Sequence, residues 1–478
     1  MSNPDTDKPV DLAEETPARR LEPTRTGLPP LAAAQFDVAS TEDSLELLVA
    51  STRELGDLYR VYAPGRKRDT WICNHPDDIK RLLVTNHRNY TKGVGLDRVK
   101  ILLGNGIMVS EGDFWKRQRR MIQPAFHRKM VEQYAAVIDT ALDNAQVRWD
   151  AAVHSSEPFD ITAEMSALTL DIILRSIFGE DLAWLETRMG GNNPFAVVTE
   201  HSARDLLFAY KFRSLAKLVV ELVAARRAGQ WERFDFLQML MDARDKDDRP
   251  MPDREMVDEA LTLVVAGHET SASALNWAWY LVATHPAALE RLEAEVDAID
   301  CVAVAQPGAV SEPTASEPNA SGPRSMTYAA SEQLVWTQAV LKEAMRLYPP
   351  GWLLTRRSVE EDVLGGYLVP SGTDVMLSPY LIQRHPTYWP EPEAYRPERF
   401  LPEAEAAREK WVYIPFAAGP RHCVGENFAL YEMTVHVARM ARRYRLEYLD
   451  EGPIPIEAAV NLRALRPLRF RVHFRKTP

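Results

Sequence analysis

Apolar residues recur at helical spacing along most of the chain between about residues 114 and 299. This pattern predicts helices over residues 130–149, 165–178, 212–227, 236–244 and 253–284. The last segment spans about 32 residues and is apolar in its middle and polar at both ends. We expect such a helix to run through the core of a large α-helical domain.

Shorter patterned segments lie toward both ends of the chain. Residues 58–62 and 70–73 flank the turn Pro64-Gly65-Arg66-Lys67 and predict a β-hairpin. A helix through residues 79–84 follows, with Asn74 as its expected cap. Strands are also predicted over 352–357, 366–369, 374–377 and 470–474, and helices over 333–347 and 427–444. The predicted fold class is mainly α with small β-sheets.

Two segments lack this patterning. Residues 1–35 are rich in Pro, Thr, Glu and Arg, and predict a flexible or docked N-terminal tail. Residues 301–326 consist largely of Ala, Ser, Pro and Gly, and predict a low-complexity loop. Because this loop is short and centrally placed, we expect one domain over residues 36–478 that carries the loop as an insertion.

Charge and composition narrow the classes of function. The chain has 57 basic and 68 acidic side chains and a net charge of −11, which argues against a nucleic-acid-binding surface. It contains no run of about 18 or more apolar residues, so no membrane span is expected. Its first residues lack the basic and apolar regions of a signal peptide. These features predict a cytoplasmic protein.

The three cysteines, Cys73, Cys301 and Cys423, are far apart and form no CxxC pair, which argues against a disulfide framework or a cysteine zinc site. Cys423 differs from the others because it directly precedes a predicted helix and lies beside Arg421. A helix N-terminus and a nearby cation both favour the thiolate, which is the metal-binding form. A single thiolate without companion ligands suits haem iron, whose in-plane ligands come from the porphyrin.

The residues around Cys423 follow the pattern FxxGxRxCxG, with Phe416, Gly419, Arg421 and Gly425 at the other fixed positions. This segment resembles the haem-binding signature of the cytochrome P450 family. The resemblance covers about residues 35–478 and implies the cytochrome P450 fold enclosing one haem b. It also implies that Cys423 is the axial ligand of the iron and that the other four residues contact the cofactor.

The long predicted helix contains Ala266-Gly267-His268-Glu269-Thr270. A zinc-protease helix is excluded, because HExxH needs His at position 272, which is Ala272. Gly267 weakens a helix, and the Thr270 hydroxyl can bond to a freed carbonyl. The segment resembles the family's distal-helix motif. That resemblance implies that Glu269 and Thr270 are the catalytic acid–alcohol pair and that Ala266 and Gly267 border the cofactor.

Three further resemblances concern charged residues. Glu343 and Arg346 share a helix face, and with Arg399 they resemble the family's buried structural cluster. Trp115 and Arg119 resemble the WxxxR helix, whose side chains bind a haem propionate. Arg357 and Arg421 are further expected propionate ligands. For the first of these two, the neighbouring Arg356 remains an alternative.

The resemblance implies a haem-thiolate monooxygenase that inserts one oxygen atom of O2 into a hydrophobic substrate such as a fatty acid, terpenoid, carotenoid or steroid. The sequence has no Walker A or GxGxxG motif. Electrons from NAD(P)H are therefore expected to arrive indirectly, through a ferredoxin or flavodoxin with its reductase, and the protein is expected to be a monomer. A candidate docking patch combines Lys116, Arg117, Arg120, Arg128, Lys129, Arg421 and His422. The substrate-lining residues implied are Val94, Leu96, Leu103, Leu263, Leu353 and Leu354.

Two alternatives stay open. A peroxide-driven or rearranging haem-thiolate enzyme shares the cysteine loop, although Glu269 and Thr270 favour the monooxygenase. A haem sensor or carrier without turnover needs neither a proton relay nor a docking patch. Two segments also depart from the family pattern: the 301–326 loop is long, and the stretch between about 180 and 215 is short for the two helices that roof the pocket.

Overall fold

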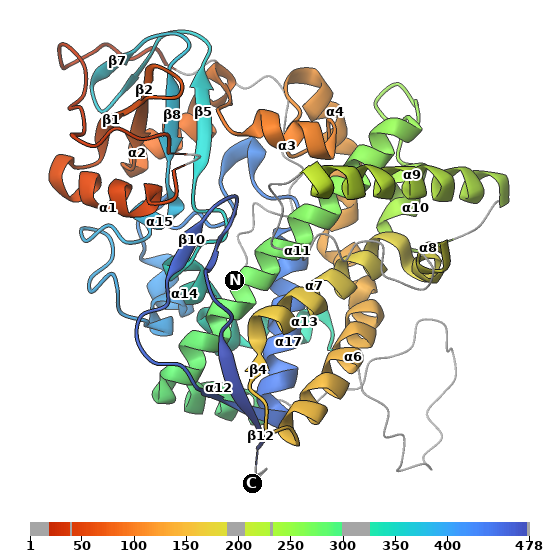
Figure 1. Cartoon of the computed structure of the whole chain (residues 1–478). Coiled ribbons are helices and arrows are strands. Elements are labelled where there is room, and N and C mark those ends of the chain that lie inside the picture. The colour runs from red at the N-terminus through yellow and green to blue at the C-terminus, as the bar shows by residue number, and fades with distance from the viewer. Residues whose placement is uncertain (1–18, 39–40, 189–205, 230–232, 299–325, 476–478) are drawn as a thin grey trace, which may run out of the picture.

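The computed structural model describes residues 19–38, 41–188, 206–229, 233–298 and 326–475 (Figure 1). In this part of the chain the α-helices are α1 (Ser44–Leu55), α2 (Pro76–Lys80), α3 (Leu96–Leu103), α4 (Gly112–Ile122), α5 (Arg128–Val131), α6 (Ala135–Val153), α7 (Ile161–Phe178), α8 (Leu182–Arg188), α9 (Leu206–Gly229), α10 (Phe236–Asp242), α11 (Asp253–Thr284), α12 (Pro286–Ala298), α13 (Tyr328–Glu332), α14 (Val335–Leu347), α15 (Pro379–Ile382), α16 (Pro402–Ala406) and α17 (Glu426–Arg443). The predicted class, mainly α with small sheets, is confirmed.

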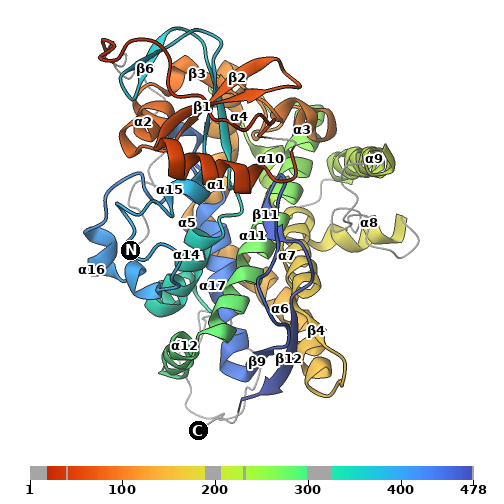
Figure 2. The same ribbon diagram turned by 60° about the vertical axis from the view of Figure 1, so that its left-hand side comes forward.

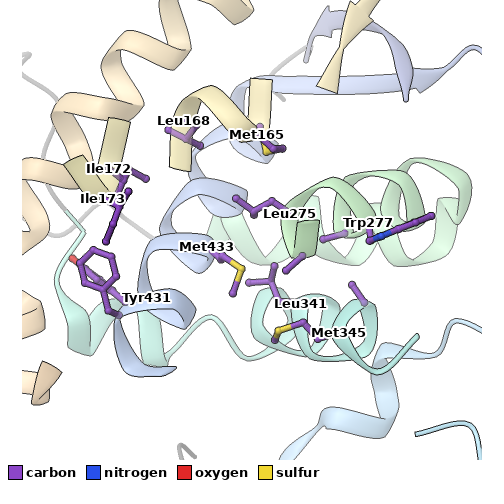
Figure 3. Packing of buried hydrophobic residues seen from close by; sticks show 14 of the residues in the cluster. Met165, Leu168, Ile172, Ile173, Leu275, Trp277, Leu341, Met345, Tyr431 and Met433 are labelled. Atoms are coloured by element: carbon purple, nitrogen blue, oxygen red, sulfur yellow. The ribbon is translucent and has the colours of Figure 1, made fainter. Parts of the chain in front are cut away.

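Helix α11 begins and ends at the predicted residues and crosses the middle of the molecule (Figures 1 and 2). It packs along α7 and also contacts α14 and α17. Figure 3 shows how these four helices share one apolar core, with Ile173 from α7, Leu275 from α11, Leu341 from α14 and Met433 from α17. Burial of such side chains supplies the main stabilisation of a helical domain of this size.

The largest sheet lies at one end of the molecule (Figure 1). Its strand order is β1 (Leu58–Ala63), β2 (Arg68–Cys73), β8 (Asp374–Leu377), β5 (Leu354–Ser358) and β3 (Tyr90–Lys92). The pair β2–β8 is parallel, and the other three pairs are antiparallel. A second cluster of buried apolar side chains joins α1 to this sheet.

Three smaller sheets complete the fold. Strands β10 (Ile456–Ala458) and β11 (Leu462–Ala464) form a hairpin, and β6 (Asp362–Leu364) and β7 (Tyr367–Val369) form another. The third sheet has the order β4 (Phe159–Asp160), β12 (Arg469–Phe474) and β9 (Tyr444–Tyr448). Figure 2 shows the strand β11 beside α11.

The structure corrects the predicted cap of the second helix. His75 caps α2, because its Nδ1 accepts a hydrogen bond from the Asp77 N–H at 3.3 Å and Pro76 fits the first helical position. Asn74 is buried instead, and its Oδ1 accepts from the Ser378 N–H at 3.2 Å. After α2 the chain continues as a π-helical turn, Arg81–Thr85.

One predicted helix is divided. The helix expected over residues 130–149 is split into α5 and α6 by a 3₁₀ turn, Glu132–Tyr134. Helix α3 lies between Gly95 and Gly104, both of which have positive φ. A residue other than glycine would not easily adopt a positive φ at either position.

The described part of the N-terminal tail is docked. The Thr24 N–H donates to the Gly366 carbonyl at 3.0 Å, the Ala32 N–H to Arg60 at 2.8 Å, and the Phe36 N–H to Tyr62 at 3.0 Å. The 301–326 loop lies outside the described residues except for Met326, as do Cys301 and residues 189–205 between α8 and α9. Within the described ranges, no helix is both long and apolar enough to cross a membrane.

Candidate functional site

The Cys423 loop lies directly before α17. The Cys423 N–H donates to the Phe416 carbonyl at 2.9 Å and closes the loop, and Phe416 packs against the main core. Burial raises the pKa of the Cys423 thiol, while hydrogen bonds from the N–H groups of Gly425 and Glu426 and the charge of Arg119 lower it. These donors at the helix N-terminus stabilise the thiolate form.

The thiol of Cys423 is accessible, although enough protein surrounds it to desolvate it. A cysteine sulfur that can be reached from outside but is partly desolvated by the surrounding protein can bind a metal ion that is part of a cofactor. Among the described residues, no group of three or more His, Cys, Asp or Glu side chains could hold a metal ion. Haem would supply the in-plane ligands that a single thiolate lacks.

The two glycines of the loop have different surroundings. Gly419 has φ +68°, and a Cβ there would lie 1.9 Å from the carbonyl oxygen of Leu83 in the π-helical turn. Gly425 has an ordinary φ of −91°. A Cβ there would meet Phe126 at 3.8 Å and the Cys423 sulfur at 4.0 Å. Gly419 thus permits close packing of the loop, whereas Gly425 keeps the space beside the sulfur clear.

Four cations gather beside this loop, and we name them the cation cluster: Lys92, Arg119, Arg356 and Arg421. Burial lowers the pKa of Lys92 to about 7 and those of Arg356 and Arg421 to about 10. It also lowers the pKa of Arg119. Lys92 and Arg356 lie directly opposite each other in the β3–β5 pair, where like charges are destabilising. A bound dianion such as the two haem propionates would relieve this repulsion.

The other contacts of the cluster hold it in place. Arg421 pairs with Glu111, and its guanidinium lies 3.8 Å from the ring centre of the buried Trp115. The Arg119 Nη1 donates to the carbonyl of His422 at 2.8 Å, and the Lys92 backbone N–H donates to Glu111 Oε1 at 2.7 Å. The predicted residues Trp115, Arg119 and Arg421 are thus brought together, and the residues present fit the propionate side of a haem.

Arg357, expected as a propionate ligand, and its alternative Arg356 have different surroundings in the structure. Its side chain is 43% exposed, and its Nε donates to Asp374 Oδ1 at 2.7 Å. Arg356, the alternative, is the buried member of the pair. Successive side chains of β5 point to opposite faces, and Arg357 lies opposite Asp374 in the β5–β8 register. The sequence analysis missed Lys92, because only the β3–β5 register brings it to the cluster.

On α11 the Thr270 Oγ1 donates to the Ala266 carbonyl at 2.7 Å. The helix continues unbroken through Gly267, at which a Cβ would lie 2.8 Å from Ile173 of α7. In this structure Gly267 therefore permits close packing of α11 on α7, and the helical break that a weakening glycine suggested is not present.

The other two polar residues of this motif, His268 and Glu269, form hydrogen bonds with two different elements of the fold. The buried His268 bonds through Nε2 to the Ser166 hydroxyl at 3.0 Å, and burial lowers its pKa to about 4. Glu269 Oε2 accepts a hydrogen bond from Asn461 Nδ2 at 2.6 Å. Burial raises the pKa of Glu269, and the Asn461 bond lowers it.

A second buried carboxyl adjoins the motif and was missed by the sequence analysis. Glu432 on α17 accepts a hydrogen bond from the Ser271 hydroxyl at 2.5 Å. Burial raises the pKa of Glu432 to about 8. The available signal was the position of Glu432 between Tyr431 and Met433 on the helix that follows Cys423.

Glu343, Arg346 and Arg399 come together as expected. Glu343 and Arg346 are fully buried, and two hydrogen bonds of 2.7 and 2.8 Å join them. The Arg399 Nε lies 3.4 Å from Glu343 Oε1. Arg346 also donates to the carbonyls of Gln383 and Pro392, at 2.8 and 2.7 Å. The cluster therefore fastens α14 to the chain that leads toward the Cys423 loop.

The expected substrate-lining residues divide between the two apolar clusters. Leu103, Leu263 and Leu354 belong to the main core, whereas Val94 and Leu353 pack with the cluster around α1. Leu96 is half-buried at the start of α3.

The candidate docking patch is partly neutralised. Lys116 pairs with Asp113 at 2.9 Å, Arg128 with Glu332 at 3.1 Å, and Arg117 with Glu255. His422 lies 3.2 Å from Glu426. Arg120 and Lys129 are exposed.

The chain is similar to known proteins over most of its length. Residues 27–201 and 207–474 match the family described as Cytochrome P450. Cyclooctatin synthase of Streptomyces melanosporofaciens is 32% identical over 88% of this chain and 90% of its own length. Cyclooctat-9-en-7-ol 5-monooxygenase of the same organism is 31% identical, covering 85% of each chain. The human ultra-long-chain fatty acid omega-hydroxylase is 28% identical over 78% of this chain and 74% of its own.

Proposed function

The chain belongs to the cytochrome P450 family, and from that premise we propose a terpenoid monooxygenase in which the Cys423 thiolate would hold the haem iron. As a member it is an oxidoreductase that carries haem, uses O2, takes reducing equivalents from partner proteins and oxygenates hydrophobic substrates. The observation that supports these residue roles best is the accessible, enclosed Cys423 thiol beside the cation cluster.

Bound haem supplies the iron at which O2 is activated for transfer of one oxygen atom to the substrate. Cys423 would hold that iron through its thiolate. Arg119, Arg356 and Arg421 would bind the propionates, for which their planar guanidinium groups are suited. Glu343, Arg346 and Arg399 have a structural role.

Glu269 and Thr270 deliver protons on the α11 side. Because burial raises the pKa of Glu269, this carboxyl retains its proton closer to neutral pH and can donate it. The Thr270 hydroxyl, held by the Ala266 carbonyl at 2.7 Å, is the second member of the relay. Ala266 and Gly267 border the cofactor.

The proposed substrate class is based on the names of relatives and on the apolar residues that we expect to line the pocket. Relatives in Streptomyces are named for oxidation of cyclooctat-9-en-7-ol and of pentalenene. The residues proposed to line the pocket, from Val94 to Leu103 and at Leu263, Leu353 and Leu354, are mainly apolar. We therefore propose a terpenoid as the substrate.

The electron donor is proposed to be a ferredoxin or flavodoxin with its NAD(P)H-dependent reductase, acting in the cytoplasm. An acidic carrier would be attracted by Arg120 and Lys129, which are exposed on α4 and α5. The working unit is proposed to be a monomer that folds as one domain over residues 36–478. Light scattering of the purified protein tests the oligomeric state.

The function is tested by titrating purified haem-loaded protein with terpenes, fatty acids, carotenoids and steroids. We expect a spin-state shift and an oxygenated product with a terpene, when a surrogate ferredoxin system and NAD(P)H are supplied. Cys423→Ala should lose the carbon-monoxide-bound thiolate spectrum, and Thr270→Ala should raise peroxide release per NAD(P)H consumed.

Each alternative has its own signature. Product formed with peroxide but not with the ferredoxin system, and unchanged coupling in Thr270→Ala, would indicate a peroxide-driven enzyme. A haem-thiolate spectrum with neither spin shift nor product across the panel would indicate a sensor or carrier. A spin shift with fatty acids alone would exclude the terpenoid assignment.

A further inference from the structure

The β10–β11 hairpin joins two parts of the candidate site. Its tip lies on α11, where Asn461 Nδ2 donates to Glu269 Oε2 and the Ser273 hydroxyl donates to the Leu462 carbonyl, both at 2.6 Å. On its other side the Leu462 N–H donates to the Pro350 carbonyl at 3.0 Å. The Trp352 indole N–H donates to the Ala459 carbonyl at 2.9 Å. The tip is therefore held between α11 and the turn that precedes β5.

The charged neighbours of Glu269 come from the same hairpin. Arg463 Nε donates to Glu457 Oε2 at 2.6 Å, across the β10–β11 register. The charge of Arg463 favours ionised Glu269, and that of Glu457 opposes it. The effects of these two charges on Glu269 oppose each other. The hydrogen bond from Asn461 is the contact that holds one oxygen of the Glu269 carboxylate in a defined direction.

We infer that Asn461 is a positioning residue, whose side-chain amide holds the Glu269 carboxyl in place for proton delivery. This inference rests on the proposed role of Glu269. A glutamate side chain has several rotamers, and a hydrogen bond from a fixed backbone hairpin restricts them. The same hairpin bonds to Pro350 and Trp352 in the turn that precedes β5. A displacement of that turn would therefore move the hairpin and, through Asn461, the Glu269 side chain.

The contact itself is tested by hydrogen–deuterium exchange of the holoenzyme, over peptides that cover residues 456–464. Asn461→Leu keeps the approximate volume and removes the donor, so exchange should rise roughly tenfold, as expected for loss of one hydrogen bond to a carboxylate. Val460→Ala, at the exposed tip of the hairpin, is the matched control and should leave exchange near wild type.

A double variant in which donor and acceptor are exchanged distinguishes the hydrogen bond from the proton delivery that Glu269 performs. In the double variant Glu269→Gln with Asn461→Asp, the amide donates from α11 and the carboxylate accepts on the hairpin. This variant should restore protection of residues 456–464 but not coupled turnover, because no carboxyl remains at position 269. Failure of the swap to restore any protection would contradict the hydrogen bond.

The positioning role is tested by coupling, measured as product formed per NAD(P)H consumed. Asn461→Leu should lower coupled turnover about tenfold or more, as loss of a supporting contact commonly does, and should raise peroxide release. It should also move the pH profile of coupled turnover to higher pH, because the donor that favours ionised Glu269 is gone. In a Glu269→Gln background the same substitution should have little effect.

The outcomes distinguish the two levels of the proposal. Faster hairpin exchange with unchanged coupling in Asn461→Leu, while Glu269→Gln is uncoupled, would overturn the positioning role alone. Unchanged coupling in Glu269→Gln itself would overturn the proposed role of Glu269 and with it this inference. Equal loss of coupling in Val460→Ala and Asn461→Leu would show that hairpin integrity, and not the amide, is responsible.

Discussion

Alanine substitution of the two loop glycines is expected to destabilise the protein at Gly419 but hardly at Gly425. At Gly419 a side chain would adopt φ +68°, which costs about 1–2 kcal/mol for a residue other than glycine. Its Cβ would also lie 1.9 Å from the Leu83 carbonyl oxygen, whereas ordinary contact begins near 3.4 Å, so the two must separate by about 1.5 Å. Because the backbone fixes the position of the Cβ and the Leu83 oxygen is itself a backbone atom, rotation of a side chain cannot relieve this contact.

A shift of that size is large compared with the tolerance of a metal–ligand bond, which is about 0.2 Å. We therefore expect most Gly419→Ala protein to lack the carbon-monoxide-bound thiolate spectrum. The total destabilisation is expected to be about 2–4 kcal/mol, which lowers the unfolding temperature of a chain of this length by about 2–4 °C. Thermal unfolding by circular dichroism and the reduced carbon monoxide spectrum measure the two effects.

Gly425→Ala is the matched control. Its Cβ would make contacts no closer than 3.8 Å. Loss of glycine at the N-cap should cost at most about 1 kcal/mol. Any effect of this variant should therefore fall on haem binding, with little change in unfolding temperature. Gly419→Ala protein that matches Gly425→Ala in unfolding temperature and keeps a full thiolate spectrum would refute the steric reasoning.

Three further predictions concern buried charges. Glu343→Ala should cost about 3–5 kcal/mol in denaturant unfolding, because it leaves Arg346 buried without its carboxylate; a loss below about 1 kcal/mol would contradict the structural role. Glu432, with its pKa raised to about 8, should contribute stability that is fully present below its unfolded pKa of about 4.5 and is lost as pH rises through about 8. Glu432→Gln should flatten that decline by about 1 kcal/mol per pH unit, and an unchanged slope between pH 5 and 8 would count against it. Arg356→Gln should speed transfer of haem to apomyoglobin about tenfold or more, while Arg357→Gln stays near wild type; the reverse order would restore the original expectation for Arg357.

The sequence predicted those features that depend on neighbours along the chain. The bounds of α11 agree with the periodic pattern, and the Cys423 loop is recognisable because its five fixed residues lie within ten positions. The pair Glu343–Arg346 is also local, since residues three apart share a helix face. These contacts need no knowledge of how distant segments pack.

The features that were missed depend on long-range register. Whether Arg356 or Arg357 faces the cation cluster is decided by how β5 pairs with β3 and β8, and adjacent strand residues point to opposite faces. Lys92 enters the cluster through the same pairing. Asn461 lies 192 residues from Glu269 along the chain, so no spacing rule connects them. The cap of α2 was also missed because of a long-range contact. Asn74 accepts a hydrogen bond from the distant Ser378, and the cap is formed by His75.

The docked tail has a practical consequence for work with shortened forms of the protein. Strand β1 is at the edge of the large sheet, and the Arg60 N–H and carbonyl both bond to the tail, at Pro30 and Ala32. Removal of residues 19–36 would expose this edge and the buried apolar surface under Phe36. An open edge strand beside apolar surface invites pairing between chains. Truncation at residue 37 should therefore yield aggregation, whereas an affinity tag fused ahead of residue 19 leaves the edge covered.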